Sequence, residues 1–371
     1  MGTRSRVKLN SHVEVTAGSY TTLSGTSMAA PYVSGCIALY MQATGQRAPA
    51  VVLRAIMNSA MPILAPNRKA LDSPTRQGSG LIQIHDAIHS TTNVEPYKIA
   101  LNDTENFVRT ATLSIENTSN KTKTYRLSHL PAAAVSGYDL ARSAVPVAQP
   151  NYQSVSGLVS FEQAQIVLQA GETGNLQTTF GQPASGIPHL IYGGYIVVNE
   201  GDNNENRSIY VPYYGALGNQ RELPIFDRKQ GYPYIGTRMG RAVIHQRSWY
   251  KNNGNIPVYN FRAGDVLYLY TRMGSPSAIA KLQLVQNDTT VGDLPHGTDH
   301  WVSRNDHGSD SSDYVYEWRG RFILRSGSNW SIRSVSNGTF RLRALALKIF
   351  GDPQKQDDWD VWYSHQFVVI G

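Results

Sequence analysis

Ser27 is the residue of this chain with the clearest potential for chemistry. It lies in the run Leu-Ser-Gly-Thr-Ser-Met-Ala-Ala-Pro, residues 23–31. A serine hydroxyl is a weak nucleophile until a base removes its proton and donors stabilise the oxyanion. The residues after Ser27 predict a helix, and backbone N–H groups at a helix N-terminus point outward and favour negative charge. A serine at such a position has the oxyanion donors that nucleophilic catalysis needs, although the cap of an ordinary helix would use the same residue types.

The flanking residues predict how this helix is built. Gly25 permits an unusual turn and a close backbone approach. Thr26 is a candidate N-cap, and Pro31 is tolerated because it falls in or near the first turn. Gly45 supplies a stop signal after a helix that ends near residue 43. An alternative is an ordinary buried helix with a polar cap and no chemistry. The residues that support the serine are Gly25, Thr26, Met28, Ala29, Ala30 and Pro31.

The whole run resembles the nucleophile motif of the subtilases, the subtilisin-like serine proteases, whose pattern is G-T-S-M-A-x-P. The resemblance implies that Ser27 is the nucleophile of an Asp-His-Ser triad, in which Asp and His come before the serine. Only 26 residues precede Ser27, with His12 as their only histidine and Asn10 as their only asparagine. Neither sits in a recognisable motif, so the triad partners and the oxyanion asparagine cannot be assigned. We therefore expect no proteolysis by this chain alone, and interpret it as the C-terminal part of a longer protease, with a short paralogue as the alternative.

Segments after the serine also resemble the end of a subtilase catalytic domain. Pro49 opens a second predicted helix that runs to about residue 60. Residues 77–82 resemble the strand-like segment that closes the domain, and Asp86 and Ala87 fit its last short helix. The resemblance leaves much of the family's parallel sheet outside the chain. Residues 1–92 are therefore expected to expose apolar surface and to be poorly stable alone.

The run His296-Gly297-Thr298 repeats the letters of the family's catalytic-histidine motif. It lies far after the serine, and Asp299-His300-Trp301 follows it in place of small apolar residues. We predict a polar surface turn here. The remaining histidines are scattered and show no metal-ligand spacing.

Residues 93–218 lose the helical period and show short alternating runs separated by turn residues, which predicts an antiparallel β-sandwich. Several runs resemble the fibronectin type III-like domain that follows the catalytic domain in large subtilases of fungi and of bacterial cell envelopes. Gly193 and Gly194 inside one strand predict a bulge or a close backbone approach. The expected strands cover residues 107–115, 124–130, 165–168, 176–180, 192–198 and 208–214.

Residues 219–371 form a second β-rich region, with expected strands at 265–270, 281–285, 314–319, 339–347 and 366–370. Asp306, Asp310 and Asp313 could hold calcium, but without an EF-hand register a solvated loop is favoured. Asp357, Asp358 and Asp360 beside Trp359 and Trp362 suggest sugar binding, although tryptophans buried in a sandwich core are the more common outcome.

Composition narrows the function further. The chain has 371 residues, a net charge of +7 and no long Lys/Arg run, which disfavours nucleic acid as a partner. No stretch of 18 apolar residues predicts a membrane span, and no signal peptide is recognisable at the start. The single Cys36 excludes internal disulfides, and its expected role is that of a small buried side chain.

Sequons of the type N-x-S/T are compatible with a secreted glycoprotein. They occur at Asn102, Asn117, Asn120, Asn206, Asn287, Asn329 and Asn337.

These observations give one expected architecture and two functions. We predict a mixed fold: residues 1–92 are a truncated C-terminal piece of the α/β subtilisin fold, followed by two mainly antiparallel β-sandwiches at 93–218 and 219–371. The first function is a secreted serine endopeptidase acting on proteins or peptides. The alternative is a non-catalytic secreted binding or adhesion module that uses the β-domains, with contact to an acidic cell wall or matrix. No cofactor is expected; the resemblance allows calcium, with no assignable site.

Overall fold

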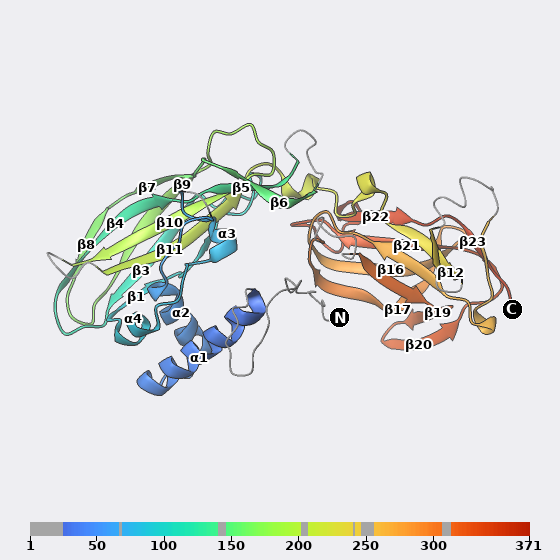
Figure 1. Cartoon of the computed structure of the whole chain (residues 1–371), viewed down its shortest axis with the longest axis horizontal. Coiled ribbons are helices and arrows are strands. Elements are labelled where there is room, and N and C mark those ends of the chain that lie inside the picture. Colours follow the sequence, from blue (N-terminus) through green and yellow to red (C-terminus); the bar gives the residue numbers. More distant parts are fainter. Residues whose placement is uncertain are drawn as a thin grey trace, which may run out of the picture.

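The computed structural model describes residues 25–66, 69–139, 146–201, 207–239, 242–245, 256–305 and 313–371. Within these residues the α-helices are confined to the part before residue 90, and antiparallel sheets make up most of the rest (Figure 1). The expected mixed fold is confirmed in its coarse form, a few helices followed by antiparallel sheets; the subtilisin-fold origin of residues 1–92 and the two β-sandwiches stay predictions. The domain boundaries at residues 92 and 218 stay a prediction.

Helix α1 (Thr26–Thr44) begins and ends at glycines. Gly25 holds the N-cap position with a φ of 147°, a value that only glycine adopts without strain. Thr26, expected as the N-cap, is instead the first helical residue, because Gly25 makes the required turn without a side chain. Gly45 ends the helix in the left-handed conformation, and its N–H donates to the carbonyl of Met41, as the stop signal predicts.

The other helices are shorter. Helix α2 (Pro49–Ser59) starts at Pro49 as expected, and α4 (Ile84–His89) contains Asp86 and Ala87. The strand expected at residues 77–82 is wrong in its first part, since Gln77 ends helix α3 (Pro74–Gln77) and only Leu81 forms a β-bridge, with Met61. The small core shared by these helices is made by Tyr40, Val52, Ala55, Ile56 and Ala87.

Two sheets follow within residues 92–216. The first has the strand order β1 (Thr92–Glu95), β3 (Thr110–Asn117), β9 (Thr173–Gly181), β7 (Leu158–Phe161). The second has the order β2 (Ile99–Ala100), β11 (Arg207–Ala216), β10 (Ile191–Glu200), β4 (Lys123–Pro131), β8 (Gln165–Leu168). The hairpin of β5 (Ala134–Tyr138) and β6 (Pro146–Gln153) is attached to it through β10. Leu113 and Leu176 of the first sheet share one core with Ile196 and Val211 of the second.

Gly193 and Gly194 of β10 allow the close backbone approach that the sequence predicts. A Cβ atom at Gly193 would lie 2.4 Å from the carbonyl oxygen of Tyr213, and one at Gly194 would lie 2.8 Å from that of Leu130. The pairing of β10 with β11 runs through both glycines without a register shift, so no bulge forms there.

Two further sheets lie within residues 234–369. One has the order β13 (Ala242–His245), β12 (Tyr234–Met239), β15 (Leu267–Thr271), β18 (Tyr314–Trp318). The other has the order β14 (Val258–Tyr259), β23 (Phe367–Val369), β21 (Gly338–Leu347), β16 (Ser277–Gln286), β17 (Thr289–Val302), β19 (Arg321–Ser326), β20 (Asn329–Ser334), with β22 (Trp359–Tyr363) beside β21. Leu269 and Trp318 of one sheet share a core with Leu342 and Phe367 of the other.

The helical segment is attached to the first pair of sheets by buried polar contacts. Strand β1 is the edge of its sheet, and Asn58 of α2 covers that edge. The Asn58 side chain accepts from the N–H of Val94 at 2.8 Å and donates to the carbonyl of Val94 at 3.2 Å. Asn58 is 3% exposed. Its buried amide makes the two hydrogen bonds that a neighbouring strand would otherwise make to the backbone of Val94.

A second attachment involves the buried carboxylate of Asp72. Arg76 forms an ion pair with Asp72 at 2.9 Å, and the hydroxyl of Tyr152 in β6 donates to the same carboxylate at 2.9 Å. The hydroxyl of Tyr195 in β10 donates to the carbonyl of Gly78 at 3.0 Å. The segment around α3 is therefore held by side chains of the β10 sheet and its hairpin.

Asn58→Ala is expected to lower the free energy of unfolding by about 3 kcal/mol, because two buried backbone groups of Val94 lose their partner. Asn120→Ala, at an exposed position, should change it by no more than about 0.5 kcal/mol. Chemical denaturation of both variants measures the difference. Equal stability of the two variants would contradict the role given to Asn58.

His129 of β4 predicts a pH dependence of stability. It lies 2.8 Å from the hydroxyl of Tyr213, and burial lowers its pKa; burial lowers the pKa of His189 in the same direction. Below the ordinary histidine pKa of about 6.5, the unfolded chain takes up protons that these folded groups resist. The stability that these two histidines contribute should therefore be fully present above that pH and be lost as the pH drops below it. In denaturation experiments, His129→Gln should reduce the fall in the free energy of unfolding between pH 7 and pH 5. The control is His85→Gln, at an exposed position. An unchanged pH dependence in His129→Gln would contradict the role given to His129.

Candidate functional site

Ser27 occupies the second position of helix α1. The N–H groups of Met28 and Ala29 donate to the carbonyl of Gly25 at 3.0 and 3.2 Å. The N–H groups of Thr26 and Ser27 come before the first intrahelical bond and point out of the helix end. The positive end of the helix dipole adds to them, so negative charge beside Ser27 is stabilised.

Pro31 stands inside α1, just beyond its first turn. It has no N–H, so the carbonyl of Ser27 lacks the donor that would normally come from four residues later. Both backbone groups of Ser27 are therefore outside the hydrogen-bond ladder of the helix. The residues from Gly25 to Tyr32 are exposed, which leaves the serine accessible from solvent.

No basic partner for Ser27 is found within the part of the chain that the structure describes. No hydrogen bond or ion pair there joins Ser27 to a histidine or an acid. His12 and Asn10 lie outside the described residues. His296 belongs to strand β17 of the last sheet, where it is exposed with a φ of 56°. The turn expected at residues 296–298 is thus wrong, because these residues continue a strand, although the side chain of His296 is on the surface.

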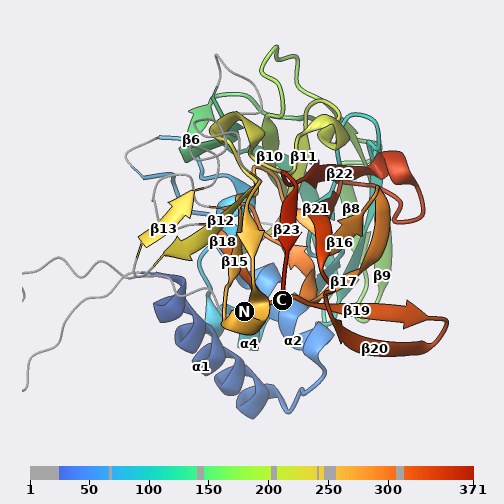
Figure 2. The same ribbon diagram turned by 90° about the vertical axis from the view of Figure 1, so that its right-hand side faces the viewer.

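The helical segment exposes apolar side chains, as expected. On α1 only Cys36 and Tyr40 are buried, and Tyr32 and Leu39 are 57% and 53% exposed. In Figures 1 and 2, α1 lies at the margin of the molecule and not between two layers. The expected burial of Cys36 is confirmed. Further exposed apolar side chains of this segment are Met28, Leu53, Met61, Ile63, Leu64 and Leu81.

The sequons differ in accessibility. Asn117 is fully buried, and its amide donates to the carbonyls of Lys121, Leu168 and Gln169. It is therefore no glycan acceptor in the folded chain, contrary to expectation. Asn206 lies outside the described residues, and modification of the others stays a prediction. Asn102 is half-buried, and the exposed acceptors are Asn120, Asn287, Asn329 and Asn337.

The acidic residues considered as ligands are mostly engaged in structure. Asp306 and Asp310 lie outside the described residues, while Asp313 pairs with Arg272 at 2.7 Å and accepts from the hydroxyl of Tyr232 at 2.8 Å. Over the described ranges, no group of three or more His, Cys, Asp or Glu side chains could hold a metal ion.

Near the C-terminus, Asp358 and Asp360 are buried, each with one arginine partner. Asp358 pairs with Arg221 and Asp360 with Arg228, and Asp360 also accepts from two backbone N–H groups. These acids anchor β22 and are not available to a ligand. Trp362 is half-buried and packs against the hydrophobic core as expected, whereas Trp359 is half-buried outside that core, contrary to expectation. Asp357 is exposed.

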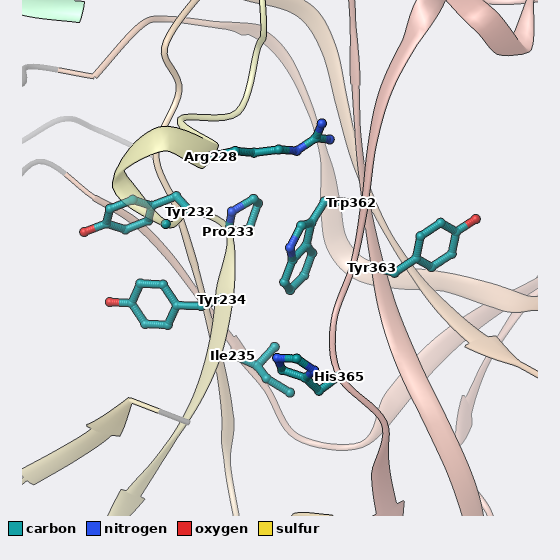
Figure 3. Close-up of a pocket in the computed structure, with 9 residues that line it drawn as sticks. Arg228, Tyr232, Pro233, Tyr234, Ile235, Trp362, Tyr363 and His365 are labelled. Atoms are coloured by element: carbon teal, nitrogen blue, oxygen red, sulfur yellow. The ribbon is translucent and has the colours of Figure 1, made fainter. Parts of the chain in front are cut away.

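One aromatic hollow of about 270 Å³ lies between β12 and β22 (Figure 3). Trp362 stands opposite Pro233, with His365 beside Ile235. Arg228 closes one end, but its charge is already neutralised by Asp360. The hollow therefore offers ring surfaces without a free charge.

Comparison with known proteins confirms the resemblance to subtilases. Residues 2–80 match the subtilase family, and residues 99–214 match an Fn3-like domain. The PI-type proteinase of Lactococcus lactis subsp. cremoris is 25% identical over 395 residues, covering 91% of this chain and 20% of that protein. The minor extracellular protease Vpr of Bacillus subtilis (strain 168) is 27% identical over 167 residues, covering 42% of this chain and 21% of that protein.

The PII-type proteinase of Lacticaseibacillus paracasei is 26% identical over 237 residues, which is 58% of this chain and 12% of that protein. The chain thus spans a fifth or less of the length of most of these relatives. Among solved structures, the class 5 fimbriae chaperone CfaA is 8% identical over 74% of this chain and 98% of that chain, with a TM-score of 0.27, too low to support an argument. Among the described residues, no helix is both long and apolar enough to cross a membrane.

The exposed face of α1 yields a prediction. Leu39→Glu should change the free energy of unfolding by no more than about 0.5 kcal/mol and reduce the fluorescence of the apolar dye ANS. Its neighbour Tyr40 is buried, so Tyr40→Ala should cost about 3 kcal/mol. If Leu39→Glu proves as destabilising as Tyr40→Ala, this face is covered in the folded chain.

Proposed function

We propose, from the subtilase and Fn3-like segments that the chain carries, that it is part of a subtilisin-like serine endopeptidase with Ser27 as its nucleophile. The Ser27 hydroxyl attacks the scissile carbonyl of a protein or peptide and forms an acyl-enzyme, which water then hydrolyses. The base and its orienting carboxylate come from polypeptide N-terminal to this chain in the whole protease.

The observation that carries the proposal is the position of Ser27 within the family motif. It lies in the first turn of an exposed helix, and its backbone N–H has no intrahelical acceptor. An N–H donor at the nucleophile itself can stabilise the oxyanion as the tetrahedral intermediate forms. The flanking residues Gly25 and Pro31 support it by freeing the backbone at both sides.

The exposed apolar side chains of α1 and its neighbours give a second argument. Several large apolar side chains there are exposed, which is the state expected of a segment whose neighbouring sheet belongs to other polypeptide. We assign residues 1–92 to the catalytic domain and residues 93–218 and 219–371 to two β-sandwich domains. By its relation to an extracellular protease, we also place the protein outside the cell.

Ser27→Ala tests the nucleophile in a whole protease in which a subtilase segment with Asp and His precedes this chain. Hydrolysis of fluorescent casein should fall by about 10⁶-fold, the loss seen when a triad serine is removed. Ser154→Ala is the control, because Ser154 is an exposed serine outside residues 1–92. The control should keep full activity.

The chain by itself should show no hydrolysis above that of its own Ser27→Ala variant. A fluorophosphonate probe should label Ser27 in the whole protease, as located by peptide mass spectrometry, and should not label the isolated chain. Activity of the isolated chain that Ser27→Ala abolishes would place the base inside these 371 residues. Activity unchanged by Ser27→Ala in the whole protease would remove Ser27 as nucleophile.

A further inference from the structure

The outer face of the largest sheet carries a trough of about 500 Å³, distinct from the serine segment. The strands β16, β21 and β22 are neighbours there (Figure 1). Along each strand alternate side chains face outward, and several of those between them belong to the hydrophobic core. The residues that matter for its chemistry are Lys281, Gln283, Arg343, Gln354, Trp359 and Tyr363.

Two aromatic rings lie on the same face of β22. Trp359 and Tyr363 are four residues apart in the strand, so their Cα atoms are about 13 Å apart. That spacing suits a short chain of rings better than a single ring. Tyr363 is 44% exposed, and Trp359 is half-buried with its indole N–H donating to the carbonyl of Pro353 at 3.2 Å. The rings are therefore held in place and still accessible.

Planar polar groups lie beside Tyr363 on the neighbouring strands and are held in place by hydrogen bonds. The strand register places Gln283 opposite Arg343, and Arg343 opposite Tyr363. Arg343 donates to the Gln283 side chain at 3.0 Å and to the hydroxyl of Thr290 at 2.6 Å. Gln283 in turn donates to Asp293 at 2.8 Å. Such preorganised amide and guanidinium groups suit the hydroxyls of a sugar.

The charge in the trough is positive and uncompensated. Lys281 lies over the ring of Trp359, with its ammonium 4.9 Å from the ring centroid, and it has no ion pair within the described part of the chain. The partners of Arg343 are neutral. No carboxylate lines the trough, since Asp358 and Asp360 are buried with their own arginines.

We propose that this trough binds an acidic oligosaccharide, a chain of sugar rings that carries carboxylate or phosphate groups. The apolar faces of the sugar rings pack on Trp359 and Tyr363, the hydroxyls meet Gln283 and Arg343, and the anionic group meets Lys281. The aromatic hollow of Figure 3 lacks such a free cation, which is why the trough is the better site for this ligand. The binding is independent of proteolysis by Ser27.

Affinity electrophoresis of the whole chain tests the proposal with three polymers: polygalacturonate, phosphorylated dextran and unmodified dextran. At least one of the two acidic polymers should retard the chain, and the more retarding of them identifies the anionic group. Unmodified dextran should not. Lys281→Gln should weaken the retardation about tenfold, the value of one charge-assisted contact. Lys121→Gln removes the same charge from an exposed site in the Fn3-like region and should leave it unchanged.

Tyr363→Ala separates ring packing from simple charge attraction and should weaken binding about fivefold. Tyr32→Ala, at an exposed tyrosine on α1, is its control. Near-ultraviolet circular dichroism checks that each variant keeps its fold. Absence of retardation by either acidic polymer, equal weakening by Lys281→Gln and Lys121→Gln, or full binding by Tyr363→Ala would each overturn the proposal. Retardation by unmodified dextran as strong as by the acidic polymers would do the same.

Discussion

The attachment of the helical segment to the edge of the first sheet is the interaction on which the arrangement of the chain depends. The core inside that segment is small, and most of α1 faces solvent. A segment of this kind cannot hold its shape by hydrophobic burial alone. The amide of Asn58 on Val94 and the buried carboxylate of Asp72 supply fixed, directional contacts in its place. Helix α2 and the α3 segment are therefore fixed to the Fn3-like region, and α1 packs on this helical segment through Tyr40.

In the last sheets, buried ion pairs hold strand β22 in position. Asp358 and Asp360 flank the start of β22 and pair with Arg221 and Arg228, which lie in the segment that enters this region. A buried carboxylate that lost its arginine would be costly, so these pairs fix where β22 lies against β21. The outward side chains of β22 are thereby fixed too. Asp358 and Asp360, which the sequence suggests as part of a sugar site, are instead structural residues in buried ion pairs. The neighbouring Trp359 and Tyr363 line the trough.

The sequence predicts much of the helical segment and less of the sheets, for identifiable reasons. Gly45 ends a helix by adopting the left-handed conformation, and Pro49 is tolerated at the first position of the next helix, so both boundaries are predictable. The hairpin strand β6 was not expected because Pro146 and Pro150 are unfavourable in a strand, and its position at the end of a sheet is what tolerates them. The family motif identifies Ser27. Of the trough, the sequence indicates only Trp359, because β-register brings together residues far apart in the chain. A signal was available in the alternation of polar and apolar residues along β16 and β21, which marks an outward face.

The β5–β6 hairpin contacts both ends of the molecule. Tyr152 holds Asp72 of the helical segment, whereas Arg304 of the last region donates to the carbonyls of Gly137 and Val147 at 2.9 Å. Tyr138 completes the second junction through a buried contact with a serine of that region. The hairpin therefore connects the helical segment to the last region. If the C-terminal sheets were tethered to a surface, a pulling force on the molecule would reach the helical segment through this hairpin. The strength of its few hydrogen bonds would then set the force at which the two ends separate.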